Sequence, residues 1–352
     1  MKYRHSLNSI ILTILFCLSS ACGKAPQAAE PSDPLASPEM PEPVSIKIGY
    51  LPFISNTIFL IAEEEGYFDE QGLDVELILF KSSNELMPML MAGEIDVIPP
   101  ALNPAIFNAF SREGKSRIIL PLTDFGIRNC SVATYLARKS DIDAGMYADK
   151  KDWINAKWVL SSMPVNSMPG YVLANALTPA GLSVDDIQIE MVELPAQEEA
   201  LRNGQVDIVY AVEPWITRMT AKGDIVILDS AERYAPELSS SLVIAGPRII
   251  DDPDVGRRFA IAYLKAVRQY MEGPTPRNVE LAVQLTGLAP ELMEQICWSS
   301  SPVNGVVNTA SLMDFQEWLL ERGLVDELVS MEDIYEPAFA EYAVSVLGEA
   351  VP

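Results

Sequence analysis

Short apolar segments alternate with longer amphipathic segments along residues 45–120, and this is the pattern of an α/β fold. Strands are predicted at 45–49, 75–80, 95–98 and 118–120, and helices at 57–65, 84–92 and 104–111. Two of these helices end at Gly66 and Gly93, and glycine favours helix termini. Strands that alternate with helices build a parallel sheet covered on both faces. The pattern therefore predicts an α/β lobe that begins near residue 45.

The same pattern recurs about 110 residues later in the chain. GLDVELILF at 72–80 and AGEIDVIPPALNP at 92–104 correspond to GLSVDDIQIEMVEL at 181–194 and NGQVDIVYAVEP at 203–214. Three positions match between the copies: Gly72 with Gly181, Gly93 with Gly204, and Asp96 with Asp207. We expect the glycines to take positive φ at helix C-caps, and the aspartates to bind turn amides beside them. Both roles are structural, and the repeat predicts two similar lobes.

Two segments connect the predicted lobes. A strand at 132–137 leaves the first lobe, and a strand at 241–245 returns the chain to it. We therefore assign 45–137 and 241–352 to the first lobe, and 138–240 to the second. From residue 252 onward the chain is mostly helical, and the apolar positions between 259 and 270 share one helix face, which we expect to pack on the first lobe.

The first 22 residues have the layout of a secretory signal peptide. Lys2 and Arg4 precede an apolar run at 10–18, and small residues at 19–21 lead to Cys22. The apolar run is too short to span a bilayer. The small residues before Cys22 resemble the bacterial lipobox, in which the cysteine is acylated, although Leu18 stands four residues before Cys22 instead of the usual three. We expect Cys22 to carry a lipid anchor.

Residues 23–44 predict a flexible tether between that anchor and the lobes. Six of them are proline, and most of the others are alanine, serine and glutamate. Such a segment buries too little apolar surface to offset the entropy of ordering it.

Charge and composition narrow the possible partners and chemistries. The formal net charge is −24, which disfavours nucleic acids and anionic membrane surfaces as partners. We expect a monomer that touches the membrane only through its N-terminal lipid. His5 is the only histidine, so a chain without its signal peptide has no histidine for catalysis or metal binding. No cofactor and no metal is predicted. Cys130 and Cys297 either form one disulfide or are buried small hydrophobic residues.

The segment from 48 to 97 resembles the opening of a known family. The strings IGYLP, EEGYFDEQGLDVEL and AGEIDV, together with NGQVDIVYAVEPW further on, are similar to bacterial solute-binding proteins for nitrate, sulfonates, taurine and thiamine pyrimidine precursors. The resemblance covers residues 45–245 well and the helical tail loosely. It implies a type II-like, two-lobed periplasmic binding protein fold with parallel-rich sheets and a helical C-terminal tail. It also implies an ABC permease with its ATPase as the partner.

In that family the ligand contacts lie in the loops that follow the strands, and in open α/β sheets ligands bind there. The candidate ligand-binding residues are Tyr50, Phe53, Asn56, Lys81, Ser82, Ser83, Asn103, Ser161, Ser162, Asn166, Tyr210, Glu213 and Trp215. Each has a structural alternative. The serines suit helix caps, the aromatic side chains suit the core, and Glu213 beside Pro214 suits a turn.

The expected ligand is a neutral or amino-bearing aromatic heterocycle, such as a pyrimidine, a thiamine precursor or a flavin. A nitrate or sulfonate needs cations or aimed amides, and Lys81 and Arg128 are the available cations. The loop aromatics, Glu213 and the negative net charge weigh against such an anion.

Three classes of function remain. The first is an exported receptor for an importer, and the second is a sensory ligand-binding module. The third is an enzyme like the fungal thiamine-pyrimidine synthases, which depend on a histidine and a cysteine-rich motif. We expect the receptor and no enzymatic activity.

Overall fold

The computed structural model describes residues 43–80, 85–126, 130–160, 164–190, 192 and 194–350. Within these ranges all seven elements predicted between residues 45 and 120 are present, with their ends shifted by a few residues. No helix in the described ranges combines the length and the apolar character needed to cross a membrane.

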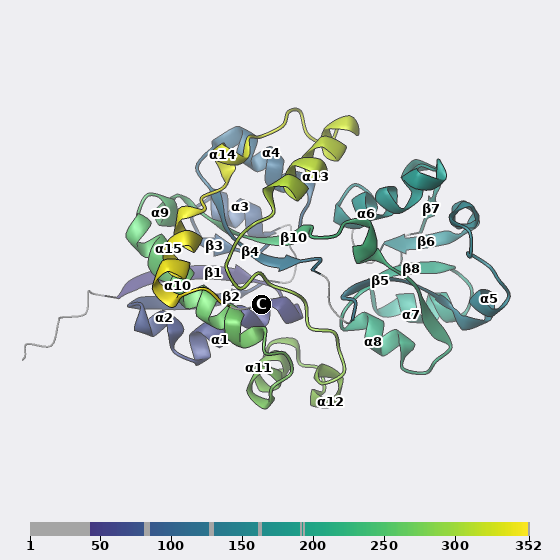
Figure 1. Ribbon diagram of the computed structural model, residues 1–352, viewed down its shortest axis with the longest axis horizontal. Coiled ribbons are helices and arrows are strands. Elements are labelled where there is room, and N and C mark those ends of the chain that lie inside the picture. Colours follow the sequence, from purple (N-terminus) through teal and green to yellow (C-terminus); the bar gives the residue numbers. More distant parts are fainter. Residues whose placement is uncertain are drawn as a thin grey trace, which may run out of the picture. The chain divides into compact units, whose positions relative to one another are not determined.

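The first sheet contains five strands in the order β2-β1-β3-β10-β4 (Figure 1). Their bounds are β1 (Val44–Tyr50), β2 (Leu73–Leu79), β3 (Val97–Ile98), β4 (Arg117–Asp124) and β10 (Ser239–Ala245). β1 runs parallel to β2 and β3, with Tyr50 opposite Leu79. β10 is antiparallel to both of its neighbours, β3 and β4. All seven residues of β10 are buried, which is typical of a central strand covered on both faces.

The second sheet repeats this arrangement in the order β7-β6-β8-β5-β9. Its strands are β5 (Ala133–Arg138), β6 (Lys157–Leu160), β7 (Gln188–Ile189), β8 (Ile208–Val212) and β9 (Ile225–Ser230). β6 is parallel to β7 and β8, and β5 is antiparallel to β8 and β9. Each sheet therefore has two parallel and two antiparallel neighbour pairs, so the sheets are mixed instead of parallel-rich.

The predicted lobe boundary at residue 137 is wrong. β5 pairs along its length with β8 and β9, so residues 133–137 belong to the second sheet. The chain leaves the first lobe between β4 and β5, in residues 125–132, which we call the first crossing. It returns between β9 and β10, in residues 231–238, the second crossing. The apolar run at 132–137 predicted a strand, but its pairing partners are set by tertiary structure.

Helices cover both faces of the first sheet. One face carries α1 (Thr57–Glu64), α2 (Tyr67–Glu70), α9 (Pro247–Ile250), α10 (Pro253–Tyr270), α11 (Pro276–Thr286), α12 (Pro290–Met293) and α15 (Ala338–Leu347). The other face carries α3 (Leu86–Met91), α4 (Pro104–Glu113), α13 (Thr309–Glu321) and α14 (Met331–Ile334). Alternate residues of β10 divide between the two cores: Leu242 faces one and Val243 the other. The predicted apolar face of α10 is confirmed, since Phe259 and Tyr263 are fully buried.

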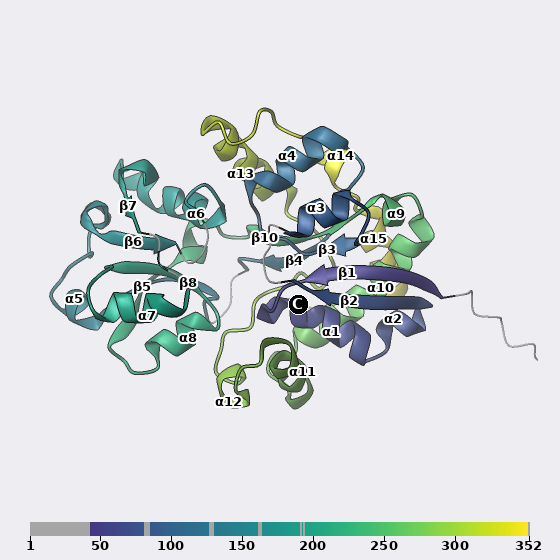
Figure 2. The same cartoon turned by 180° about the vertical axis from the view of Figure 1, so that it is seen from behind.

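The second sheet lies between α6 (Met168–Leu177) on one face and α7 (Leu194–Arg202) with α8 (Trp215–Thr220) on the other (Figure 2). The remaining elements are α5 (Lys139–Asp143), η1 (Ile54–Asn56), η3 (Lys150–Asn155), η4 (Thr178–Ala180), η5 (Val184–Asp186) and η6 (Ala231–Tyr234). Tyr135 and Trp158 pack under α6, with their ring centroids 5.4 Å apart.

In each lobe, the matching aspartate links two strands of the same sheet. Asp96 Oδ2 accepts a hydrogen bond from Lys47 N at 2.8 Å, and Asp207 Oδ2 accepts one from Lys157 N at 3.0 Å. The prediction that these carboxylates bind amides of their own turns is therefore wrong: Asp96 binds β1 and Asp207 binds β6, each about 50 residues earlier. An arginine completes each site, Arg248 at 3.2 Å from Asp96.

In the second lobe the corresponding arginine is Arg138, at 2.8 Å from Asp207. The glycine prediction is confirmed, because Gly93 and Gly204 have φ of 69° and 72° and reverse the chain before each aspartate. The repeat in the sequence thus corresponds to a repeated turn, carboxylate and arginine.

We expect Asp96→Ala to lower the free energy of unfolding by about 1–3 kcal/mol, because it leaves the Lys47 amide without its acceptor. Asp207→Ala should lower the free energy of unfolding by less, since the Asp207 side chain is 22% exposed and that of Asp96 only 5%. Urea unfolding of both variants, with the exposed Glu94→Ala as a control, measures the difference. Equal losses in the two aspartate variants would contradict this ranking.

Candidate functional site

A disulfide fixes the first crossing to the C-terminal part of the chain. Cys130 and Cys297 are bonded, with an S–S distance of 2.05 Å and their Cα atoms 5.8 Å apart. The sequence left the pairing of these cysteines open, and the structure decides it. The bond joins residues 167 positions apart. Closing a loop of this size stabilises a fold by about 2–5 kcal/mol, mainly by restricting the unfolded chain.

The buried carboxylate of Glu213 holds the same junction. Glu213 directly follows β8 and is joined to Pro214 by a cis peptide bond. Its Oε1 accepts hydrogen bonds from Thr217 Oγ1 at 2.8 Å and Cys297 N at 3.2 Å, and its Oε2 accepts one from Thr217 N at 3.1 Å. Its own amide donates to the carbonyl of Val132 in the first crossing. Burial raises the pKa of Glu213, although these hydrogen bonds act in the opposite direction.

A second carboxylate binds the other side of the same crossing residue. Glu232 Oε1 accepts a hydrogen bond from Val132 N at 2.8 Å, and its Oε2 lies 3.4 Å from Ser230 Oγ. Burial raises the pKa of Glu232 as well. Val132 is therefore held through its amide by the second crossing and through its carbonyl by β8.

The loop after β1 places three predicted residues close together. Tyr50 ends the strand half-buried, and burial raises the pKa of its hydroxyl. Phe53 is 50% exposed. Asn56 is buried and donates from Nδ2 to the carbonyl of Leu51 at 2.9 Å. Within the described ranges its Oδ1 has no hydrogen-bond partner.

The same loop leads into the N-terminus of α1. Thr57, the first residue of α1, is fully buried, and its Oγ1 also has no partner among the described residues. Free backbone amides at a helix N-terminus favour polar or negatively charged groups. Here, however, η1 runs directly into α1, so Asn56 N donates to the carbonyl of Phe53 and Thr57 N to that of Ile54. This end of α1 therefore presents the unpaired Oδ1 of Asn56 and the exposed ring of Phe53, and not free amides.

The side chains of four other predicted site residues make contacts within the protein. Asn103 caps α4, since Oδ1 accepts from Ala105 N at 2.9 Å and Nδ2 donates to Ala101 O at 2.8 Å. Tyr210 is 1% exposed beneath α6, and its hydroxyl lies 3.7 Å from Met168 Sδ. Trp215 begins α8, with the guanidinium of Arg218 4.7 Å from its ring centroid.

The fourth is Asn166, which lies after β6 and accepts a hydrogen bond from Arg322 Nη2 at 3.3 Å. Sequence reasoning missed Arg322, because it stands 156 residues away from Asn166 and no local pattern marks it. Glu232 was missed for the same reason.

The remaining predicted site residues lie outside the described ranges. They are Lys81, Ser82, Ser83, Ser161 and Ser162, together with Cys22 and the candidate cation Arg128. Tyr50, Phe53 and Asn56 thus lie in one segment, from the end of β1 to the end of η1, and Asn103 and Tyr210 have structural partners. In the described part of the chain, no group of three or more histidine, cysteine, aspartate or glutamate side chains is placed to hold a metal ion.

A groove of about 730 Å³ lies between α6 and α13. Its lining residues include Tyr171, Asn175 and Asp185 on one side, and Trp318 and Arg322 on the other. A neighbouring recess of about 250 Å³ extends along the second crossing.

The fold is similar to that of several solved proteins. The periplasmic aliphatic sulphonate binding protein SsuA from Escherichia coli is 17% identical, with a TM-score of 0.67 over 84% of this chain and 93% of that one. The periplasmic nitrate-binding protein NrtA from Synechocystis PCC 6803 is 12% identical, with a TM-score of 0.66 over 88% and 90%. The desulfurization enzyme DSZB is 15% identical, with a TM-score of 0.61 over 86% and 99%.

At these identities the likeness establishes the fold, and the predicted two-lobed periplasmic binding protein-like architecture is confirmed. The model of the NMT1-like family matches residues 39–286, so the chain belongs to that family. A comparison with curated proteins gives no significant match.

We expect Glu213→Ala to lower the free energy of unfolding by about 1–3 kcal/mol, because Cys297 N and Thr217 lose their acceptor. The loss should depend on pH. The folded-state pKa of Glu213 lies above its unfolded value, so its contribution to stability is largest below the unfolded pKa and declines as pH rises through the folded pKa.

Urea unfolding of the wild type and Glu213→Ala at about pH 4 and about pH 7 checks this sign. The difference between the two proteins should be larger at the lower pH. Glu294→Ala, an exposed carboxylate near the same loop, is the control and should show no such dependence. A difference that grows with pH would refute the assignment.

Proposed function

We propose that this protein captures a small solute between its two lobes and delivers it to an ABC permease with its ATPase. The observation that carries the proposal is the pairing of two five-stranded sheets with the same strand order, joined by two crossings. In open α/β sheets, ligands bind outside the carboxyl ends of the strands. SsuA and NrtA, which are named as periplasmic binding proteins, share this fold. Closure of the lobes around a solute is a hinge motion that such a fold supports.

The bound solute is proposed to be a neutral or amino-bearing aromatic heterocycle. The exposed ring of Phe53 offers a face for stacking. The formal net charge of −24 weighs against an anionic solute. A sulfonate or nitrate is the alternative, and Lys81 and Arg128 are the candidate cations for it.

The protein is proposed to act outside the cytoplasm as a lipid-anchored receptor. The disulfide between Cys130 and Cys297 supports export, since such bonds persist in oxidising compartments. Residues 1–22 supply the signal peptide, Cys22 the anchor, and 23–44 the tether. In a bacterial host, Cys22→Ala should move the protein from the membrane to the soluble fraction after lysis, and Cys17→Ala should not. Retention of the Cys22→Ala variant in the membrane would refute the anchor.

An enzymatic role is the second candidate, because DSZB has a similar fold and is named as an enzyme. Two observations favour binding without turnover. The only histidine is His5, and both cysteines of the lobes are held in a disulfide, so neither is a free thiol nucleophile. A sensory module differs from a transport receptor in its partner, and a permease gene beside this one would favour transport.

Thermal unfolding of the full chain against a panel of solutes tests the proposed function. The panel contains nitrate, taurine, alkylsulfonates, pyrimidines, thiamine and riboflavin. A solute present at 100 times its dissociation constant stabilises the folded state by about 2.7 kcal/mol, which raises the midpoint measurably. A rise with a heterocycle supports the proposed ligand class, and a rise only with an oxyanion overturns it. Chemical conversion of the bound solute would refute the proposal that the protein is a receptor without enzymatic activity.

We expect Phe53→Ala to weaken binding of the stabilising heterocycle about tenfold, because the ring no longer stacks on the solute. The midpoint of the solute-free protein should not change, since Phe53 is 50% exposed. Tyr342→Ala removes a comparably exposed ring on α15 and is the matched control. Isothermal titration of the three proteins measures the effect, and equal affinities would remove Phe53 from the site.

A further inference from the structure

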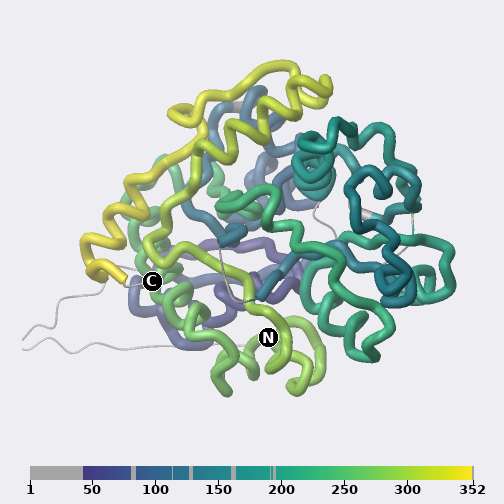
Figure 3. The backbone as a smooth tube through the Cα atoms, turned by 45° about the vertical axis from the view of Figure 1, so that its right-hand side comes forward, coloured from purple at the N-terminus to yellow at the C-terminus, as the bar shows by residue number. Residues whose placement is uncertain are grey.

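Helix α13 packs on the first lobe although it lies far from that lobe's sheet in the sequence. Phe315 of α13 is 6.0 Å from Phe107 of α4, measured between ring centroids. Ser311 Oγ accepts a hydrogen bond from Ser239 N, the first residue of β10, at 3.3 Å. Figure 3 shows the chain of α13 beside the segments of the first lobe.

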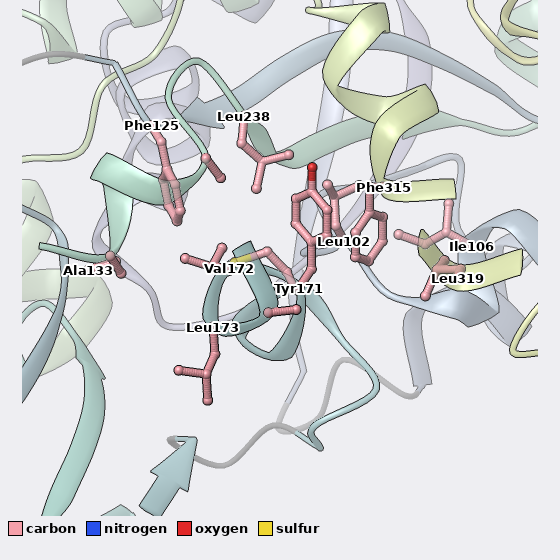
Figure 4. Close-up of a cluster of buried hydrophobic side chains, with 14 of the residues drawn as sticks. Leu102, Ile106, Phe125, Ala133, Tyr171, Val172, Leu173, Leu238, Phe315 and Leu319 are labelled. Atoms are coloured by element: carbon pink, nitrogen blue, oxygen red, sulfur yellow. The ribbon is translucent and has the colours of Figure 1, made fainter. Parts of the chain in front are cut away.

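The opposite side of α13 contacts the second lobe. Tyr171 of α6 meets Phe315 edge-on, with a centroid distance of 5.3 Å (Figure 4). It also meets Trp318 edge-on, at 5.7 Å. Phe315 therefore touches an aromatic ring from each lobe, and one continuous apolar cluster runs through both.

Arg322, the C-cap residue of α13, adds polar contacts to the same lobe. Its Nη1 and Nη2 donate to the two carboxylate oxygens of Asp185 at 2.8 and 2.5 Å. Nη2 also donates to Asn166 Oδ1 at 3.3 Å, in the segment that follows β6. The two parallel bonds to Asp185 fix the direction of the guanidinium, and the side chain of Arg322 is only 19% exposed.

The groove beside these contacts indicates that they oppose rotation of one lobe relative to the other. The groove between α6 and α13 has one wall in each lobe, and the adjoining recess is lined by Ala235, Pro236 and Leu238 of the second crossing. Rotation of one lobe about the crossings must therefore widen or narrow this groove. The contacts of Tyr171 and Arg322 across it resist either change.

We propose that α13 sets the resting separation of the two lobes, and that Arg322 is a positioning residue for the segment that carries Asn166. The aromatic contact acts as a pivot, and the arginine fixes the angle of the second lobe about it. The consequence for solute affinity rests on the proposed function, because only the population of lobes able to close contributes to binding. The effect on lobe separation does not depend on any solute.

Distances between spin labels on the two lobes test the proposal in the full chain without solute. Labels attached through a non-natural ketone residue at Asp74 and Asp152, both exposed, leave every cysteine unmodified. Arg322→Ala and Trp318→Ala should broaden or shift the distance distribution relative to wild type. Arg277→Ala is the control, because its carboxylate partners, Glu64, Glu65 and Glu280, all lie in the first lobe.

A distribution unchanged in both variants, with folding confirmed by thermal unfolding, would overturn the proposal. Exchanging the charges gives a second test. Asp185→Arg alone should perturb the distribution, and Asp185→Arg with Arg322→Asp should restore it, whereas no restoration would argue against the direct pair.

With any solute that the panel identifies, Arg322→Ala should change the dissociation constant about two- to fivefold in either direction. An unchanged dissociation constant would show that Arg322 has no role in solute binding. Failure to find a solute would count against the proposed function and leave the distance test valid. Unchanged distances with normal solute binding would refute only the role of α13.

Discussion

The two lobes depend on how the chain is held where it passes between them. Val132, at the end of the first crossing, is bound through its carbonyl to Glu213 and through its amide to Glu232. The carboxylate of Glu213 also binds Cys297, which is bonded in turn to Cys130 of the same crossing. A buried carboxylate is costly unless several donors satisfy it, so this junction tolerates few alternative arrangements. The crossing is thereby fixed to β8, to the second crossing and to the C-terminal part of the chain.

Within each lobe, equivalent aspartate and arginine side chains hold neighbouring strands together. Asp96 reaches back to β1 and Asp207 to β6, and an arginine follows or ends the antiparallel strand beside each. The equivalent turn in each lobe holds β3 against β1 and β8 against β6, and the loops after these strands take their positions from it.

The C-terminal helices add a contact between the two lobes. α10 and α15 belong to the core of the first lobe, but α13 contacts both lobes through Phe315. The lobes are therefore joined by a third element besides the two crossings. Arg322, far from the loop after β6 in the sequence, contacts it through Asn166.

The sequence by itself determined the two α/β lobes, their repeat and seven elements between residues 45 and 120, because local periodicity and glycine positions specify helices and strands. It also excluded histidine chemistry beyond His5. Only the tertiary structure decided that residues 133–137 join the second sheet, that Cys130 pairs with Cys297, and that Tyr210 lies in the core. It also decided the partners of Asp96, Asp207 and Arg322. These contacts join residues about 50 to 167 positions apart, and no local pattern of apolar and polar residues encodes which distant groups meet.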